Sequence, residues 1–170
     1  MWPLNSLQKN IRAKTRKNQA KTPYISHLLG VTYHVVALGQ VRDSQAIQAS
    51  LLHDVVEATS VMLKEVQKQF GFSVAAYVAE LTDDPSRSGL ENQHLQVALA
   101  PQTSTEATQL KLADALYNLR DLSAHVPEGW SQERVDAYSE WTQVKADRLP
   151  LVHGELHSTV QQEIARHWTQ

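Results

Sequence analysis

The sequence predicts an all-α protein organised as a single helical domain over residues 1–170. Only six glycines and six prolines occur in the 170 residues, and they fall between segments whose apolar side chains recur at helical spacing. No run alternates apolar and polar residues for long enough to indicate a β-strand. The length suits one domain with a sizeable core, and no internal repeat or linker divides the chain.

The expected helices follow one another with short connections. They span 25–38, 46–58, 61–70, 73–81, 90–100, 104–124, 131–149 and a last segment after Pro150. Asp43 and Ser60 are expected to cap the second and third helices, because such side chains accept the free N–H groups of a first turn. Thr103 and Glu106 have the spacing of a capping box, and Gly71 stands where a helix ends in a left-handed residue.

The composition excludes several classes of protein. The absence of cysteine excludes disulfide frameworks, thiol nucleophiles, cysteine-ligated zinc and iron–sulfur clusters. A net charge of −2 argues against a whole surface built for nucleic acid. No apolar run reaches the roughly 18 residues that span a bilayer, and the start MWPLNSLQKNIRAK lacks the apolar region of a signal peptide. We therefore expect a soluble, cytoplasmic protein with neither a membrane nor a nucleic-acid partner.

Positive charge is concentrated in an N-terminal arm, residues 1–21. The arm contains no acidic residue, and its basic residues are Lys9, Arg12, Lys14, Arg16, Lys17 and Lys21. On charge alone, such an arm is compatible with a solvated tail, an RNA contact or one wall of an anion site.

One pair of polar residues lies in a segment that is otherwise apolar. His53 and Asp54 follow ASLL and precede VV, so the helix that carries them is expected to be buried. Buried charge is expensive unless it is paired or bound to a metal. If the pair has only a structural role, we expect the imidazole to bond a carbonyl and the aspartate to pair with an arginine. If the pair is functional, we expect both side chains to bind a metal.

Two further helices are expected to bring similar groups to the interior. His27 lies in TPYISHLLGV, and Asp114 lies in LKLADALY. Together with His53 and Asp54, these residues would offer nitrogen and carboxylate donors and leave coordination positions open. Without thiolates, such a set suits Mn²⁺, Fe²⁺, Zn²⁺ or Mg²⁺ acting as a Lewis acid and an activator of water.

The motifs that carry these residues resemble a known family. TPYISHLLGV, ASLLHDVVEAT, LKEVQKQFG, LTDD, LKLADALYNLRDL and PEGWS are similar, in order and spacing, to the hydrolase domain of the Rel/Spo alarmone enzymes. These enzymes are HD-domain metal phosphohydrolases, and the small stand-alone alarmone hydrolases are the nearest match, over residues 12–149. The resemblance implies an all-helical domain that holds one Mn²⁺ and removes pyrophosphate from the 3′ position of (p)ppGpp, giving GDP or GTP.

The resemblance also implies roles for individual residues. The metal ligands would be His27, His53, Asp54 and Asp114, the catalytic acid would be Glu57, and the substrate nucleotide would be held by Arg16, Lys17 and Asn118. Helical spacing agrees, since Glu57 follows His53 by four residues and would share its face, where a carboxylate can accept a proton from activated water.

Plainer interpretations of these residues stay open. Glu57 is alternatively a solvated acid, and Asn118 a buried amide that satisfies a loop carbonyl. Arg16 and Lys17 are alternatively part of a solvated surface arm. Lys111, Asp114, Asn118 and Asp121 recur at helical spacing, which places a polar stripe on an otherwise apolar helix.

Two positions depart from the family's motifs. The family's HDxxED reads HDVVEA here, so Ala58 replaces the second acid, and its LADKLYNLR reads LADALYNLR, so Ala115 replaces a lysine. The main hypothesis is a (p)ppGpp 3′-pyrophosphohydrolase. The alternatives are a weakened domain that binds alarmone without efficient hydrolysis, and a hydrolase for another nucleotide phosphate.

Other conspicuous residues are expected to have plainer roles. His153 and His157 have the spacing of a helical metal pair, but HGELH lacks the order of a zincin motif, so surface histidines are expected. Asp83 and Asp84 are expected to end a helix, and Trp130 fits a core anchor of the late helices.

Overall fold

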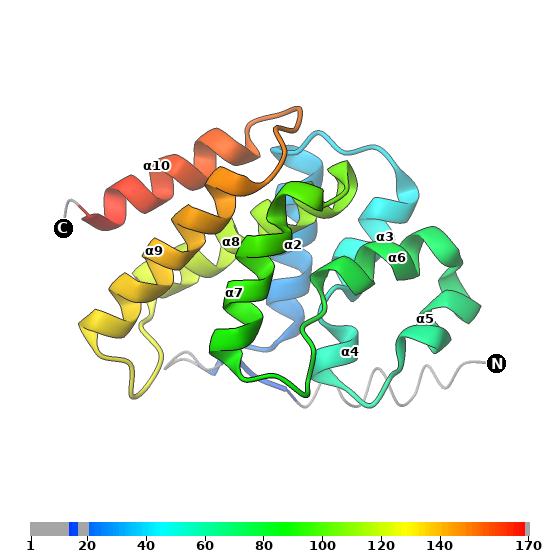
Figure 1. Ribbon diagram of the computed structural model, residues 1–170, viewed down its shortest axis with the longest axis horizontal. Helices are drawn as coiled ribbons and strands as arrows, with labels where there is room; N and C mark the ends of the chain where they lie inside the picture. Colours follow the sequence, from blue (N-terminus) through cyan, green and yellow to red (C-terminus); the bar gives the residue numbers. More distant parts are fainter. Residues whose placement is uncertain (1–13, 17–20, 169–170) are drawn as a thin grey trace.

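The computed structural model of the chain describes residues 14–16 and 21–168 (Figure 1). Over these ranges the regular structure is helical, which confirms the expected all-α class. The helices are α2 (Ile25–Ala37), α3 (Ser44–Leu52), α4 (Val55–Ala58), α5 (Leu63–Phe70), α6 (Phe72–Leu81), α7 (Gly89–Leu99), the short 3₁₀ helix η1 (Ala100–Gln102), α8 (Thr105–Ala124), α9 (Gln132–Arg148) and α10 (Leu156–Trp168). None of the described helices is both long and apolar enough to cross a membrane.

Helices α2 and α8 form the centre of the arrangement. Helix α2 packs against α8 and α3, while α8 also contacts α6, α9 and α10. Figure 1 shows α9 and α10 on one side of α2 and the group α3 to α6 on the other. Side chains that α2 and α8 direct toward each other therefore lie in the interior.

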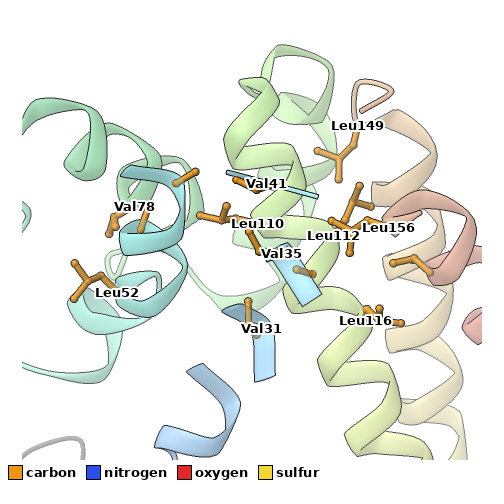
Figure 2. Close-up of a cluster of buried hydrophobic side chains, with 14 of the residues drawn as sticks. Val31, Val35, Val41, Leu52, Val78, Leu110, Leu112, Leu116, Leu149 and Leu156 are labelled. Carbon is orange, nitrogen blue, oxygen red and sulfur yellow. The ribbon is translucent and has the colours of Figure 1, made fainter. Parts of the chain in front are cut away.

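The hydrophobic core includes the contact between these two helices. Figure 2 shows part of the buried cluster, to which α2 contributes Val31 and Val35 and α8 contributes Leu110, Leu112 and Leu116. All five side chains are 0% exposed. Burial of an aliphatic side chain of this size stabilises the fold by about 1.5–3 kcal/mol, so the contact between α2 and α8 is a firm base for the polar groups that these helices carry.

The expected start of α3 and the expected end of α5 are confirmed. Asp43 accepts the N–H groups of Gln45 and Ala46 at 3.2 and 3.0 Å, which satisfies two of the free donors of the first turn of α3. Gly71, between α5 and α6, has a φ of +91°, a conformation that glycine adopts at little cost.

Two other expected caps are wrong by a few residues. Helix α5 begins later than expected, and the side chain of Glu65 accepts the N–H of Met62 at 2.8 Å, so Ser60 does not cap this helix. Helix α8 is capped by Ser104 instead of Thr103, because the serine hydroxyl is the one that reaches an N–H of the first turn.

The single helix expected over 46–58 is interrupted. Helix α3 ends before His53 and α4 begins after Asp54, so the pair lies in a turn. In a continuous helix the carbonyl of Ser50 would accept the N–H of residue 54, but this oxygen is 2.8 Å from Nδ1 of His53. The imidazole thus competes with the helix for a backbone acceptor. The prediction that one helix carries His53, Asp54 and Glu57 on a common face is therefore wrong.

The residues before α2 are folded back on themselves. An isolated β-bridge and two backbone hydrogen bonds join residues 14–16 to residues 22–24. In one of these bonds the N–H of Arg16 donates to the carbonyl of Thr22 at 2.8 Å. This pairing places Arg16 beside the start of α2, whereas Lys17, the other expected nucleotide contact, lies outside the described residues.

Gly30 lets α2 and α8 approach each other closely. A Cβ atom built at Gly30 would overlap the ring of Tyr117 on α8. The Tyr117 ring in turn packs edge-on against the ring of His27, with 4.9 Å between the ring centroids. The missing side chain at Gly30 therefore helps to set the position of His27.

We expect Gly30→Ala to lower the melting temperature, because the added methyl group must displace the packed ring of Tyr117. Overpacking of this kind costs about 1–3 kcal/mol. Gly89→Ala is the matched control, because no atom lies within 4 Å of a Cβ built at Gly89, and removing backbone freedom at a compatible site stabilises by about 0.4–1 kcal/mol. Thermal unfolding followed by circular dichroism measures both, and equal melting temperatures would contradict the close approach.

Candidate metal centre and adjoining cavity

Four polar side chains from three parts of the chain converge in the interior. His27 comes from α2, His53 and Asp54 from the turn between α3 and α4, and Asp114 from α8. The Nε2 atoms of His27 and His53 are 3.2 Å apart. Oδ2 of Asp54 lies 3.3 and 3.4 Å from these two nitrogens, and Oδ1 of Asp114 lies 3.3 and 3.8 Å from them. The structure thus brings together all the residues expected to bind metal.

The backbone sets the orientation of His53. Its Nδ1 faces the carbonyl of Ser50 at 2.8 Å, so Nδ1 carries the hydrogen and Nε2 presents its lone pair to the cluster. A histidine with a purely structural role would also bond a backbone carbonyl, and His53 does so. This bond uses Nδ1, however, so Nε2 still faces the cluster. His27 is 1% exposed and directs its Nε2 to the same point.

The cluster sets imidazole lone pairs next to negative charges, an arrangement that requires a cation or protons. Burial lowers the pKa of His53, but the charges of Asp54 and Asp114, together with the hydrogen bonds of His53, outweigh burial and raise this pKa to about 9. Burial raises the pKa of Asp54, yet its contacts with His53 and His27 more than offset this and hold the pKa well below its usual range. Without a metal, protons therefore stabilise the cluster.

The geometry and the donor set fit a divalent metal ion. With metal–ligand bonds of about 2.0–2.2 Å, neighbouring ligand atoms lie about 3 Å apart, close to the separations found here. The ligand atoms of His27, His53 and Asp114 all lie within 4.8 Å of one another, and Asp54 adds a second carboxylate. Two imidazoles and two carboxylates are donors that Mn²⁺, Fe²⁺, Zn²⁺ and Mg²⁺ accept.

Tyr24 contacts the centre, although no motif of the sequence predicts this contact. Its hydroxyl donates to Oδ2 of Asp54, and its ring centroid is 5.7 Å from that of His27. Burial, with the nearby charge of Asp54, raises the pKa of Tyr24 far above its usual value, so the hydroxyl remains a donor. A tyrosine that follows Thr22-Pro23 has the pattern of an ordinary helix start, and no local signal indicates this contact.

A cavity of about 550 Å³ adjoins the centre, and its volume suits a small-molecule ligand. Residues in its wall include Arg16, Tyr24, Glu57, Ala58, Asn118 and Trp130. Two of them link it to the cluster, because Tyr24 donates to Asp54 and Nδ2 of Asn118 donates to Oδ1 of Asp114 at 2.8 Å. A ligand in the cavity would therefore lie next to the metal ligands.

Arg16 is held in the cavity wall by two acceptors on α8. Its Nε and Nη2 donate to Oδ2 of Asp121 at 3.1 and 3.0 Å, and Nη2 also donates to Oδ1 of Asn118 at 2.6 Å. The guanidinium carbon lies 5.7 Å from the centre of the Tyr117 ring. These contacts fix the plane of the guanidinium group. The solvated-arm interpretation is therefore wrong for Arg16.

Asn118 occupies the middle of the polar stripe of α8. Its amide donates to Asp114 in the metal centre and accepts from Arg16 in the cavity wall. Asp121, one turn further along, holds the other edge of Arg16. The stripe expected from the sequence thus connects the metal centre to the cavity, and the Asn118 amide satisfies side chains instead of a loop carbonyl.

Glu57 lies in the cavity wall and is anchored by the segment that follows α6. Its Oε1 accepts the backbone N–H of Asp83 at 2.7 Å. Partial burial raises the pKa of Glu57, the hydrogen bond from Asp83 acts against this rise, and the charges of Asp54, Asp83 and Asp114 add to it. A carboxyl group with a raised pKa beside a metal centre is suited to proton transfer.

The two departures from the family's motifs lie in different surroundings. Ala58 lines the cavity, so a carboxylate at this position would enter it. Ala115 is 2% exposed and is absent from the cavity wall. Of the two replaced positions, only Ala58 lies in the cavity wall.

Trp130 and His157 lie in other surroundings than expected. Trp130, expected as a core anchor, lines the cavity, and its ring stacks with the guanidinium of Arg134 at 4.4 Å. His153 is exposed as expected, but His157 is half-buried. Among the described residues neither histidine joins a group of potential metal ligands.

Comparisons with known proteins agree with this geometry. A family model described as an HD domain matches residues 5–150. Guanosine-3′,5′-bis(diphosphate) 3′-pyrophosphohydrolase MESH1 of Xenopus tropicalis is 45% identical over 130 residues, which cover 76% of this chain and 73% of that protein. The Homo sapiens protein of the same name is 47% identical over 130 residues, with the same coverage of 76% and 73%.

A solved structure supports the same relationship. It belongs to a metazoan ortholog of SpoT that hydrolyzes ppGpp and plays a role in starvation responses. That chain matches with a TM-score of 0.90 and 36% sequence identity, covering 96% of this chain and 92% of the other. Together with the curated relatives, it confirms the resemblance to the Rel/Spo hydrolases.

We expect His53→Ala to abolish stoichiometric binding of Mn²⁺, because it removes one ligand and leaves the others too few to hold the ion. The melting temperature of the metal-free protein should fall at neutral pH, since protonated His53 faces the carboxylates of Asp54 and Asp114 and its removal leaves them without that partner. Elemental analysis of the purified variant and thermal unfolding in a chelator measure the two effects. His153→Ala, at an exposed histidine, serves as the control, and a full equivalent of Mn²⁺ in His53→Ala would disprove the site.

Proposed function

The chain belongs to the HD-domain family, and from that premise we propose that it is a Mn²⁺-dependent guanosine-3′,5′-bis(diphosphate) 3′-pyrophosphohydrolase. The proposed reaction removes pyrophosphate from the 3′ position of (p)ppGpp and leaves GDP or GTP. One observation carries the proposal: Tyr24 and Asn118 join the cluster of imidazoles and carboxylates to a cavity of about 550 Å³ whose wall includes Glu57 and Arg16. The activity named for relatives at 45% and 47% identity supports the choice of substrate.

The metal would be held by His27, His53, Asp54 and Asp114. When bound, a divalent cation supplies Lewis-acid polarisation of the phosphoryl oxygens and makes a neighbouring water more acidic. The donor set by itself is compatible with several ions, and Mn²⁺ is proposed from the resemblance to the Rel/Spo hydrolases.

Glu57 is the proposed proton acceptor. The N–H of Asp83 holds its Oε1 at 2.7 Å, which leaves Oε2 to take a proton from the attacking water. As the water oxygen bonds to phosphorus, the bond between that phosphorus and the 3′ oxygen breaks. The 3′ oxygen takes up a proton from solvent, so the products are pyrophosphate and GDP or GTP with a free 3′ hydroxyl group. The raised pKa of Glu57 suits this role, because a stronger base accepts the proton more readily.

Arg16 and Asn118 are the proposed contacts of the nucleotide. Asp121 and Asn118 fix the plane of the Arg16 guanidinium, and a planar cation of this kind stacks on a purine base. The Asn118 amide group donates one hydrogen to Asp114 and also bonds Tyr138 in the cavity wall, and we propose that a substrate oxygen takes the place of the Tyr138 hydroxyl at this amide. On the resemblance alone, Lys17 is proposed to contact phosphate.

A second candidate function is alarmone binding with weak hydrolysis, and one observation favours it. Ala58 lines the cavity at the position where the family's motif has its second acid. A protein that keeps the four proposed metal ligands but lacks a carboxylate at position 58 would still bind the nucleotide. Hydrolysis of a different nucleotide phosphate is the third possibility, since the same replacement alters the cavity wall.

Release of pyrophosphate from (p)ppGpp with added Mn²⁺ tests the proposal. Glu57→Gln should remove nearly all activity, and Ala58→Asp should raise kcat, because an added carboxylate can help to orient the water. General acid–base assistance is worth about 10²–10⁴-fold, and a bound divalent cation limits the repulsion between the new charge and the anionic substrate. Turnover by neither wild type nor Ala58→Asp would favour the binding function, and faster turnover of another nucleotide in a panel would reassign the substrate.

Replacement of Arg16 tests the nucleotide contact separately. Arg16→Ala should raise KM several-fold and leave kcat less affected, because stacking on the base contributes alike to the ground state and the transition state. Arg16→Lys should restore little, since an ammonium group has no planar face. Steady-state kinetics of both variants, with melting temperatures as the folding control, measure the effect. Unchanged KM values would exclude Arg16 from substrate binding.

A further inference from the structure

A second cavity, of about 350 Å³, lies beyond the contact between Glu57 and Asp83. Glu57 lines the first cavity, and Asp83 lines the second. The wall of the second cavity also contains Asn92 and Gln96, two amide side chains of α7. Neither amide takes part in the proposed reaction. Asn92 is only 6% exposed, and a buried amide is costly unless it is hydrogen-bonded, so the bonds that these two side chains make indicate their role.

Asn92 holds the backbone of the residue that follows Asp83. Its Oδ1 accepts the N–H of Asp84 at 3.2 Å, and its Nδ2 donates to the carbonyl of Asp84 at 3.0 Å. One side chain thus satisfies both backbone groups of a residue outside any helix. This pairing restrains the peptide on both sides of Asp84, including the one that joins it to Asp83.

Gln96, one turn along α7, holds the side chain of Asp83. Its Nε2 donates to Oδ1 of Asp83 at 2.7 Å, and its Oε1 accepts from Nζ of Lys145 at 3.4 Å. Lys145 is 5% exposed, and its ammonium lies 3.9 Å from the centre of the Trp141 ring. The buried cation on α9 therefore fixes which end of the Gln96 amide faces Asp83.

We propose that Asn92 and Gln96 are positioning residues that hold Asp83 so that its N–H fixes the carboxylate of Glu57. The hydrogen-bonded path runs from Lys145 through Gln96 and Asp83 to Glu57, and Asn92 restrains it from the side. This inference rests on the proposed function, because it takes Glu57 as the proton acceptor.

Glu57 needs such support because its own helix is short. Helix α4 has four residues, and the long side chain of a glutamate has several rotamers of similar energy. A single backbone donor selects one of them only if that donor is itself fixed. A displacement of about 1 Å at a catalytic group costs on the order of 10²-fold in rate, so loss of the support should appear in kcat.

Gln96→Glu tests the inference with little change of shape. The introduced carboxylate still accepts from Lys145, but it faces Oδ1 of Asp83 without a hydrogen to donate. We expect kcat to fall by about tenfold to a hundredfold while KM stays within about twofold, since the residues proposed to contact the nucleotide are untouched. His94→Ala, at an exposed position of the same helix, is the control and should leave both constants unchanged.

A second substitution should restore the loss. Asp83→Asn combined with Gln96→Glu reverses the direction of the hydrogen bond, because the introduced amide donates to the introduced carboxylate. Recovery of kcat in the double variant, with slower exchange of the Asp83 backbone N–H than in Gln96→Glu alone, supports positioning. If Gln96→Glu leaves kcat unchanged although it folds, or if the loss persists in the double variant, the inference is overturned.

Measurement in a Glu57→Gln background separates this inference from the proposed function. If Gln96 acts through Glu57, Gln96→Glu should cause no further loss of residual activity there. An equal loss in both backgrounds would overturn the positioning role, whereas full activity of Glu57→Gln alone would overturn the proposed proton acceptor. Asn92→Asp, which keeps the bond to the Asp84 N–H and removes the one to its carbonyl, repeats the test if Gln96→Glu fails to fold.

Discussion

The contact between two imidazole nitrogens 3.2 Å apart, faced by two carboxylates, is the constraint on which the rest of this structure depends. Inside a protein such a group persists only with protons or a cation, and its cost must be offset by packing elsewhere. The buried valines and leucines of α2 and α8 supply that packing. The same constraint accounts for the interruption between α3 and α4, since His53 binds a backbone carbonyl to aim its other nitrogen at the cluster.

Helix α8 joins the metal centre to the cavity. Asp114, Asn118 and Asp121 recur at helical spacing, and hydrogen bonds run from Asp114 through Asn118 to Arg16 and on to Asp121. A rigid helix therefore sets the distance between the proposed metal and the proposed nucleotide contact. The Asn118 amide bonds both Asp114 and Arg16. A substitution at Asn118 would therefore disturb the orientation of the Asp114 carboxylate and of the Arg16 guanidinium together.

Glu57 depends on a different kind of support. The proposed metal ligands His27 and Asp114 belong to long helices of the core, whereas Glu57 belongs to a helix of four residues. Its carboxylate is instead placed by the backbone of Asp83, outside α6. The centre thus combines ligands fixed by core packing with an acid fixed by hydrogen bonds, and the second type of support is the easier one to alter without unfolding the protein.

The helical class, the order of the helices and the set of candidate ligands can be predicted from the amino-acid sequence alone. Capping by residues such as Asp43 is local, and polar residues in apolar segments stand out at helical spacing, so these features appear in a single chain. Only the tertiary structure decided that the helix breaks at His53, that Tyr24 contacts Asp54, that Asp121 holds Arg16, and that the backbone of Asp83 holds Glu57. The last three contacts join residues 26 to 105 positions apart, and no local pattern encodes them, because they exist only once the core has brought distant helices together.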